Sequence, residues 1–150
     1  MKKILSMLMI AVLSLFVSSS CSKDDDVVGG SSLVGTKWTV TKLGTKYVLE
    51  FTSKTECQSY EADVNNNYTN NLHTATYTYD GNTVKFQEKK LFFMYPILNT
   101  CDYWYFKDAT VSGNVMILNT QHHYVVVNIK EGYVDDQDKG PESFNLMKIK

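Results

Sequence analysis

The stretch ATYTYDGNTVKFQ, residues 75–87, decides the fold class. Tyr77 and Tyr79 alternate with threonines, which is the period-two pattern of a β-strand with one buried face. The tight-turn signal DGN follows at residues 80–82, after which Val84 and Phe86 resume the alternation. The stretch therefore predicts a β-hairpin.

The same alternation recurs from residue 33 onward, and no segment shows sustained helical periodicity. In residues 47–51, for example, Tyr47, Leu49 and Phe51 form an inner face, and the residues between them form the other. We therefore predict an all-β fold: an antiparallel meander of about eight strands that closes into a barrel and so leaves no exposed edge. Strands are expected over residues 38–42, 47–51, 56–63, 75–79, 83–87, 103–107, 115–119, 124–130 and 143–149.

Three segments interrupt this meander. Residues 65–71 are rich in asparagine and predict an exposed loop, and the acidic residues 135–142 predict a solvated turn. Residues 89–100 form a long, partly apolar segment that contains LFFMYPIL at 91–98. This segment fits a strand at a barrel edge, a short helix that plugs one end, or a lid over a cavity. Simple core packing also explains its apolar residues.

The first 21 residues are organised as an export signal. Met1-Lys2-Lys3 is positively charged, residues 4–17 are almost continuously apolar, and three serines precede Cys21. The apolar run has about 14 residues, whereas a bilayer-spanning helix needs roughly 20. We predict a signal peptide over residues 1–20, acylation of Cys21, a flexible tether over 21–32 and a folded domain over 33–150. A plain secreted protein with a chance cysteine is the alternative.

Composition and motifs exclude several functions. The formal net charge is −1 and the sequence has no basic stripe, which argues against a nucleic-acid partner. It has no Gly-rich phosphate loop, nucleophile elbow or His-Glu-x-x-His motif, so we expect neither an enzyme nor a cofactor. His122-His123 would point to opposite faces of a strand, and DDQDKG at 135–140 lacks the spacing of a calcium loop. No metal site is predicted.

Two cysteines remain once Cys21 is set apart for acylation. An even pair in an oxidising compartment predicts a disulfide between Cys57 and Cys101, which would tie the third strand to the segment before Tyr103. Closing a loop of that size would stabilise the fold by roughly 3–4 kcal/mol. Two separate buried thiols are the alternative.

Several phrases resemble the small lipocalin-like lipoproteins of Bacteroidetes. LVGTKW at 33–38 is similar to their L-x-G-x-W opening, and YVLEFTS at 47–53 to their second strand. VSGNVM at 111–116 fits the same pattern, and CSKDDD at 21–26 looks like their acidic export tag. The resemblance implies a lipocalin-like barrel in which Trp38 packs across one end. It also implies a lipid-anchored place at the outer membrane, exposed at the cell surface.

The abundance of aromatic side chains is the one feature of the composition that suggests a binding site. In YWYF at 103–106, Tyr103 and Tyr105 share one face of a strand and Trp104 lies on the other. We predict Tyr95, Tyr103, Trp104 and Tyr105 as ligand-binding residues, because aromatic rings stack on sugars, bind apolar ligands and anchor interfaces.

Two functions are consistent with the sequence. The first is a barrel that binds a small apolar or glycan ligand in its cavity or at its mouth. The second is a non-enzymatic protein-interaction module, such as an inhibitor or an accessory subunit of a surface complex. An eight-stranded barrel is just wide enough to be filled by side chains or to hold one small ligand. A cavity would favour the first function, and a solid core with an exposed aromatic patch would favour the second.

Overall fold

The computed structural model describes residues 32–128 and 130–149, which form one antiparallel sheet of nine strands. The predictions for the signal peptide, Cys21 and nearly all of the tether lie outside the described residues. Within them, no helix is long and apolar enough to cross a membrane. The strands are β1 (Lys37–Lys42), β2 (Thr45–Phe51), β3 (Glu56–Ala62), β4 (Tyr68–Tyr79), β5 (Thr83–Phe86), β6 (Leu91–Ile97), β7 (Thr100–Ser112), β8 (Val115–Asn128) and β9 (Tyr133–Ile149).

Eight of these strands close into a barrel, which confirms the predicted fold class. Strands β1 to β5 pair in chain order, as do β7 to β9, and the pairs β1–β9 and β5–β7 join the two groups into a ring. Strand β6 stays outside the ring because it pairs with residues 100–105 of β7, whereas β5 pairs with residues 108–110. A β-bulge between Phe106 and Asp108 separates these two halves of β7.

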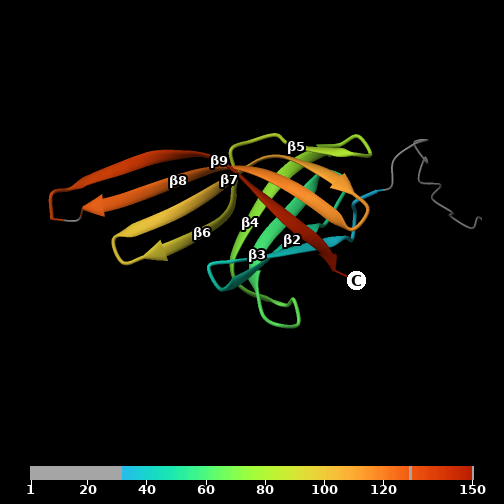
Figure 1. Cartoon of the computed structure of the whole chain (residues 1–150), viewed down its shortest axis with the longest axis horizontal. Coiled ribbons are helices and arrows are strands. Elements are labelled where there is room, and N and C mark those ends of the chain that lie inside the picture. Colours follow the sequence, from blue (N-terminus) through green and yellow to red (C-terminus); the bar gives the residue numbers. More distant parts are fainter. Residues whose placement is uncertain (1–31, 129, 150) are drawn as a thin grey trace, which may run out of the picture.

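Strands β7, β8 and β9 continue beyond the barrel. They have 13, 14 and 17 residues, whereas β1 and β2 have 6 and 7. Their outer parts and β6 form a four-stranded extension, which we call the arm (residues 91–106, 120–128 and 130–142). Figure 1 shows the arm at one end of the long axis of the molecule, opposite the end where residue 32 enters the fold.

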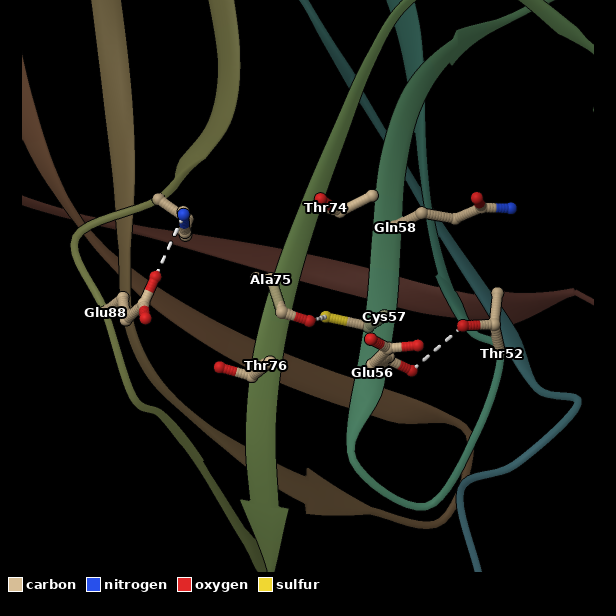
Figure 2. Close-up of a pocket in the computed structure, with 9 residues that line it drawn as sticks. Thr52, Glu56, Cys57, Gln58, Thr74, Ala75, Thr76 and Glu88 are labelled. Carbon is tan, nitrogen blue, oxygen red and sulfur yellow. Dashed lines mark hydrogen bonds and ion pairs between the residues drawn. The ribbon is translucent and has the colours of Figure 1, made fainter.

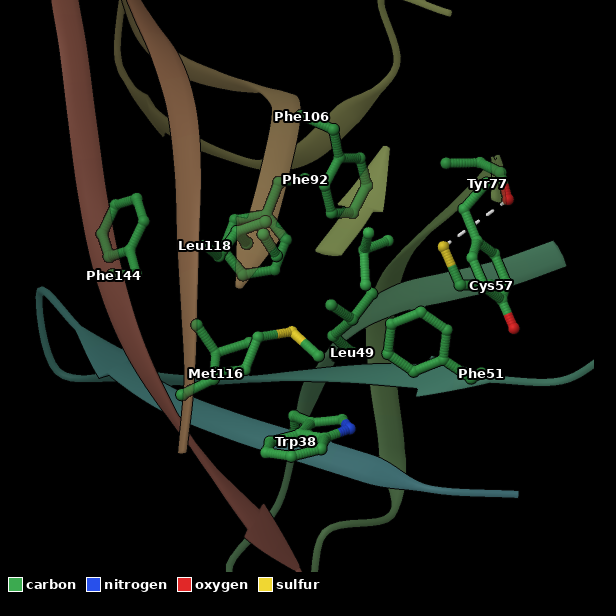
Figure 3. Packing of buried hydrophobic residues seen from close by; sticks show 14 of the residues in the cluster. Trp38, Leu49, Phe51, Cys57, Tyr77, Phe92, Phe106, Met116, Leu118 and Phe144 are labelled. Carbon is green, nitrogen blue, oxygen red and sulfur yellow. Dashed lines mark hydrogen bonds between the residues drawn. The ribbon is translucent and has the colours of Figure 1, made fainter. Parts of the chain in front are cut away.

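The barrel interior is filled with side chains. The alternation seen in the sequence places the bulky apolar residues inside, and each of the largest is almost fully buried. Aromatic rings interlock there: Phe51 packs edge-on against Tyr77 with ring centroids 4.8 Å apart. Figure 3 shows this packing for Trp38, Leu49, Phe51, Tyr77, Phe92, Phe106, Met116, Leu118 and Phe144.

Trp38 lies near the barrel end where the chain enters. Its indole Nε1–H donates a hydrogen bond to Thr36 Oγ1 at 3.0 Å, and Leu33 is buried in the same apolar cluster. The backbone N–H of Gly35 donates to the carbonyl of Phe51 at 2.8 Å, which ties the entering segment to the end of β2. This position agrees with the structural role that the family resemblance implies for Trp38.

The prediction of a turn over residues 135–142 is wrong. These residues belong to β9 and pair with β8, from Asp135 opposite Val126 to Glu142 opposite Thr120. Charged residues together with Gly140 and Pro141 are typical of turns, but they are equally typical of an edge strand that must not pair further. In the arm, β9 is such an edge.

Two other boundaries also differ from the sequence prediction. The expected loop at residues 65–71 is shorter, because β4 already begins at Tyr68. The two strands expected at 115–119 and 124–130 are one continuous strand, β8. Polar residues 119–123 separate two apolar runs in the sequence, but their backbones remain paired with both neighbouring strands.

Candidate functional site

Strand β6 closes the end of the barrel nearest the arm. Of the structures considered for residues 89–100 the strand is the one observed, and its Phe92 and Phe93 are 0% and 1% exposed within the core. Phe93 stacks on Tyr47 at 4.1 Å and on Trp104 at 4.4 Å between ring centroids. The Ser59 hydroxyl donates to the Phe92 carbonyl at 2.5 Å and so ties β6 to β3. These rings occupy the space through which a ligand would enter the barrel.

A polar network fixes the arm to this end of the barrel. The indole Nε1–H of Trp104 donates to Glu142 Oε2 at 2.6 Å, and Lys42 of β1 forms an ion pair with Glu142. His122 stacks on Trp104 at 4.4 Å, and its Nε2 lies 2.6 Å from Asp102 Oδ1. Partial burial tends to raise the pKa of Glu142, but the hydrogen bonds from Lys42 and Trp104 outweigh it and lower that pKa.

The four aromatic residues predicted to bind a ligand do not form one site. Trp104 is buried beneath Phe93, and Tyr95 packs against the core on the same side of the sheet. Tyr103 and Tyr105 lie on the other face, with nearly parallel rings whose centroids are 6.5 Å apart. The predicted division of residues 103–105 between two faces is therefore confirmed, while their role in binding stays a prediction.

The outward-facing tyrosines are partly covered by neighbouring side chains. Lys89 Nζ lies 4.3 Å from the centre of the Tyr105 ring, and His123 meets the same ring edge-on at 5.2 Å. His123 is held in turn by Asp136, whose Oδ1 lies 2.8 Å from its Nδ1. This face is therefore a mixed polar and aromatic surface rather than a broad aromatic platform.

The predicted disulfide between Cys57 and Cys101 is wrong, because both residues are free thiols. Cys57 lies in the barrel core, where its Sγ is 3.5 Å from the Ala75 carbonyl oxygen and burial raises its pKa to about 12. Cys101 lies in the arm on β7, whose partners in the sheet are β5, β6 and β8 but not β3. The length of β7 carries Cys101 away from the barrel, so the alternative of two separate buried thiols is the one observed.

The two adjacent histidines point to opposite faces of β8, as expected for neighbours on a strand. They lie well inside the strand and not in a hairpin turn. Across residues 32–128 and 130–149, no three His, Cys, Asp or Glu side chains are grouped so that they could hold a metal ion.

The arm ends in an exposed apolar surface, which we call the tip (Ile97, Leu98, Val127 and Val134). Leu98 is fully exposed in the turn between β6 and β7, where it has a left-handed φ of 49°. The N–H of Val127 donates to the carbonyl of Asn99 at 2.7 Å, so this turn lies beside the end of β8. Single exposed apolar residues are ordinary, whereas four at one projecting end form a candidate contact surface.

The arm is also the acidic part of the molecule. Residues 91–106 and 120–142 contain six acids and two lysines, a formal net charge of −4, whereas the whole chain carries −1. Three of these acids, Asp135, Asp136 and Asp138, lie on β9 close to Val134 of the tip. Any partner of the tip therefore meets a negative surface.

Two hollows lie on the outer wall of the barrel. The first has a volume of about 430 Å³ and is lined by polar residues of β3 and β4, with Glu88 and Lys90 from the connection before β6 (Figure 2). The second has a volume of about 280 Å³ and is lined by residues of β1, β2 and β3 together with Asn66, Asn67, Tyr68 and Leu72. Gln58 lines both hollows, so they adjoin each other on β3.

Sequence reasoning missed the tip and both hollows. The run PIL before Asn99 was a signal for an exposed apolar turn, because asparagine favours turns. Val127 and Val134 carried no such signal, since only the pairing of β8 with β9 places them opposite each other. Predicting the hollows would have required knowing which outward-facing residues of separate strands lie side by side.

Comparisons with known proteins do not assign the chain to a family. No family model matches it, and no curated protein matches it. Among solved structures, it is similar to a rhizavidin–biotin complex with a TM-score of 0.41 and 13% sequence identity, over 80% of this chain and 98% of that chain. The barrel architecture described above is established by the strand pairing of this chain itself.

Proposed function

We propose that this protein is a lipid-anchored module of the outer membrane, displayed at the cell surface, that binds a protein partner through the tip of its arm. The observation that carries the proposal is the exposed apolar tip at the end of the molecule opposite residue 32 (Figure 1). A chain anchored at Cys21 and tethered through residues 21–32 would hold the barrel near the membrane. The tip would then point away from it.

The filled barrel supports a surface interaction over a ligand held inside. The rings of Phe92, Phe93 and Trp104 pack at the mouth, and the remaining interior is occupied by the buried core. An internal ligand would have to displace these rings, and packed interiors tolerate such changes poorly. A site on the arm needs no such rearrangement.

The charge around the tip supports a protein partner over a lipid surface. An apolar tip could in principle enter a bilayer, but Asp135, Asp136 and Asp138 would then approach anionic headgroups, which is unfavourable. We propose a partner with an apolar pocket for Leu98 and its neighbours, bordered by basic residues that face these aspartates. Such complementary charge would steer association and make it sensitive to salt.

Site-specific crosslinking in cells tests this proposal. A photoreactive amino acid is placed at Leu98, and the matched control carries it at Ile117, which is 45% exposed on the barrel wall. We expect one discrete protein adduct from position 98 and none of the same mass from position 117. The partner, identified by mass spectrometry and purified, should bind the wild-type protein, bind Leu98→Asp at least tenfold more weakly, and bind less tightly as salt increases.

The outcomes that contradict the proposal are equally specific. Equal adducts at both positions, an adduct only with phospholipid, or a partner whose affinity is unchanged by Leu98→Asp would each refute it. The anchor is tested separately by metabolic labelling with palmitate, which should be incorporated by the wild type and not by Cys21→Ala. If the wild-type protein is not labelled but still binds the partner, only the proposed lipid anchor is refuted.

A further inference from the structure

The smaller hollow on the barrel wall has the features of a binding site, independent of the arm. Val48 and Tyr60 belong to the outward-facing side of β2 and β3, outside the core cluster, yet they are 0% and 4% exposed. Tyr60 lines the hollow, whose other lining residues include Asn66, Tyr68 and Leu72. The ring of Tyr60 meets that of Tyr68 edge-on, with centroids 5.9 Å apart.

The floor of this hollow is an ion pair between Lys37 and Glu50, whose opposite charges neutralise each other. Glu50 Oε2 accepts hydrogen bonds from Tyr60 at 3.0 Å and Gln58 at 3.3 Å, and lies 3.1 Å from Lys37 Nζ. Burial tends to raise the pKa of Glu50, but these donors outweigh it and lower that pKa. Because Lys37 and Glu50 neutralise each other, the floor favours an uncharged ligand over an anion or a cation.

The rim is a short segment held in a defined shape. Asp63 Oδ1 accepts hydrogen bonds from the backbone N–H groups of Asn65 and Asn67, and Asp63 Oδ2 accepts one from the Asn67 side chain. Asn66, between them, has a left-handed φ of 67°. Its side-chain Oδ1 is buried and has no hydrogen-bond partner among the described residues. An unpaired buried acceptor costs free energy, so a rotation of this amide toward a donor in the hollow is favoured.

We propose that this hollow binds a neutral saccharide. A hydroxyl of the sugar would donate to Asn66 Oδ1, and the amide of Gln58 would contact a second hydroxyl. Tyr68 is 57% exposed at the rim, so its ring would be available to the C–H groups of a sugar ring. Tyr60, Tyr68 and Leu72 supply apolar contact area in the hollow, and the other lining residues supply hydrogen-bond donors and acceptors.

The neighbouring hollow suggests that the ligand is longer than one sugar. From Gln58 the wall continues along Glu56, Thr74 and Thr76, whose side chains face outward (Figure 2). Hydroxyl and carboxylate groups in this row can donate to and accept from the hydroxyls of a second ring. We therefore expect a disaccharide to bind more tightly than its monosaccharide.

An NMR titration tests this site with defined probes. The ¹⁵N-labelled chain from Ser22, which contains every residue that the structure describes, is titrated with methyl glycosides of glucose, galactose, mannose and N-acetylglucosamine, then with maltose and cellobiose. Concentrations reach about 20 mM, which detects dissociation constants in the millimolar range. We expect at least one sugar to shift the backbone amides of Asn66, Asn67 and Tyr68 while the amides of the tip stay unchanged.

Two variants and a matched control decide the result. Asn66→Gly keeps a residue that tolerates the left-handed φ and removes only the amide side chain, and Tyr68→Ala removes the exposed ring. Each should weaken binding at least fivefold. Asn71→Gly is the control, because Asn71 also has a left-handed φ, of 53°, but does not line the hollow. No shift with any sugar, shifts elsewhere on the protein, or equal binding by Asn66→Gly and Asn71→Gly would overturn the proposal.

Discussion

Replacing Phe93 by alanine tests whether β6 closes the barrel. The Phe93 side chain is 1% exposed, and ring centroids of Tyr47, Trp104, Phe92 and Phe144 lie 4.1, 4.4, 4.9 and 5.5 Å from its own. Phe-to-Ala changes in cores cost about 3–5 kcal/mol, because the transfer free energy is lost and a cavity remains. These four rings come from β2, β6, β7 and β9, so they cannot readily collapse into the space. We expect a loss of about 4 kcal/mol.

Urea unfolding followed by tryptophan fluorescence measures this loss. With a denaturant dependence of about 2 kcal/mol per molar urea, the midpoint should fall by about 2 M. The matched control is Tyr105→Ala, which removes a ring from the opposite face of the same sheet and should cost only about 1 kcal/mol. If Phe93→Ala is too unstable to fold, Phe93→Leu should still fold and lose about 1–2 kcal/mol.

A loss of less than about 1 kcal/mol for Phe93→Ala, or one no larger than for Tyr105→Ala, would contradict this role of Phe93. Either result would mean that β6 rests loosely on the barrel. The mouth of the barrel would then be open to a ligand, and a binding site inside the barrel would be compatible with the structure.

The two thiols, the Glu142 network and the tip can each be tested by a single measurement. When the chain from Ser22 is unfolded without reductant and alkylated, mass measurement should find both Cys57 and Cys101 modified. In the folded protein, the buried Cys57 should resist modification. If neither cysteine is modified after unfolding, the two are joined by a disulfide. Because the pKa of Glu142 is lowered in the folded state, its contribution to stability is present above the unfolded-state pKa of about 4.3 and is lost as pH falls through the folded value. Glu142→Gln should therefore flatten the acid limb of stability against pH, and an unchanged limb would contradict the role of the network. Leu98→Asp should change the free energy of unfolding by no more than about 0.5 kcal/mol, since the side chain is fully exposed, and a larger loss in urea unfolding would show that the tip is structural.

Local alternation predicted the barrel well where each strand has one buried and one exposed face. In β2, Tyr47, Leu49 and Phe51 are inside as expected, and in β9 Phe144 and Leu146 are buried. The hairpin at residues 75–87 is also present, with Tyr77 opposite Phe86 and Tyr79 opposite Val84. These elements were predictable because burial of one face of a strand produces a period of two in the sequence of apolar residues.

The arm was not predictable in the same way. Its β9 edge exposes Asp135, Asp136 and Asp138 to water, and a solvated turn would have the same composition. The prediction of a disulfide failed for a related reason. Counting thiols indicates whether they can pair, but only the course of β7 past the barrel determines how far Cys101 lies from the strands around Cys57.

Alternation along the chain was sufficient to identify an antiparallel β protein, the side chains that face inward in most strands, and the bulk of those side chains. The tertiary structure decided that the ring closes between β5 and β7, that β6 is left outside it, and that β7 to β9 continue as an arm with an exposed tip. The physical reason is that alternation reports only whether a residue is buried, whereas closure and projection depend on pairing between strands far apart in the chain.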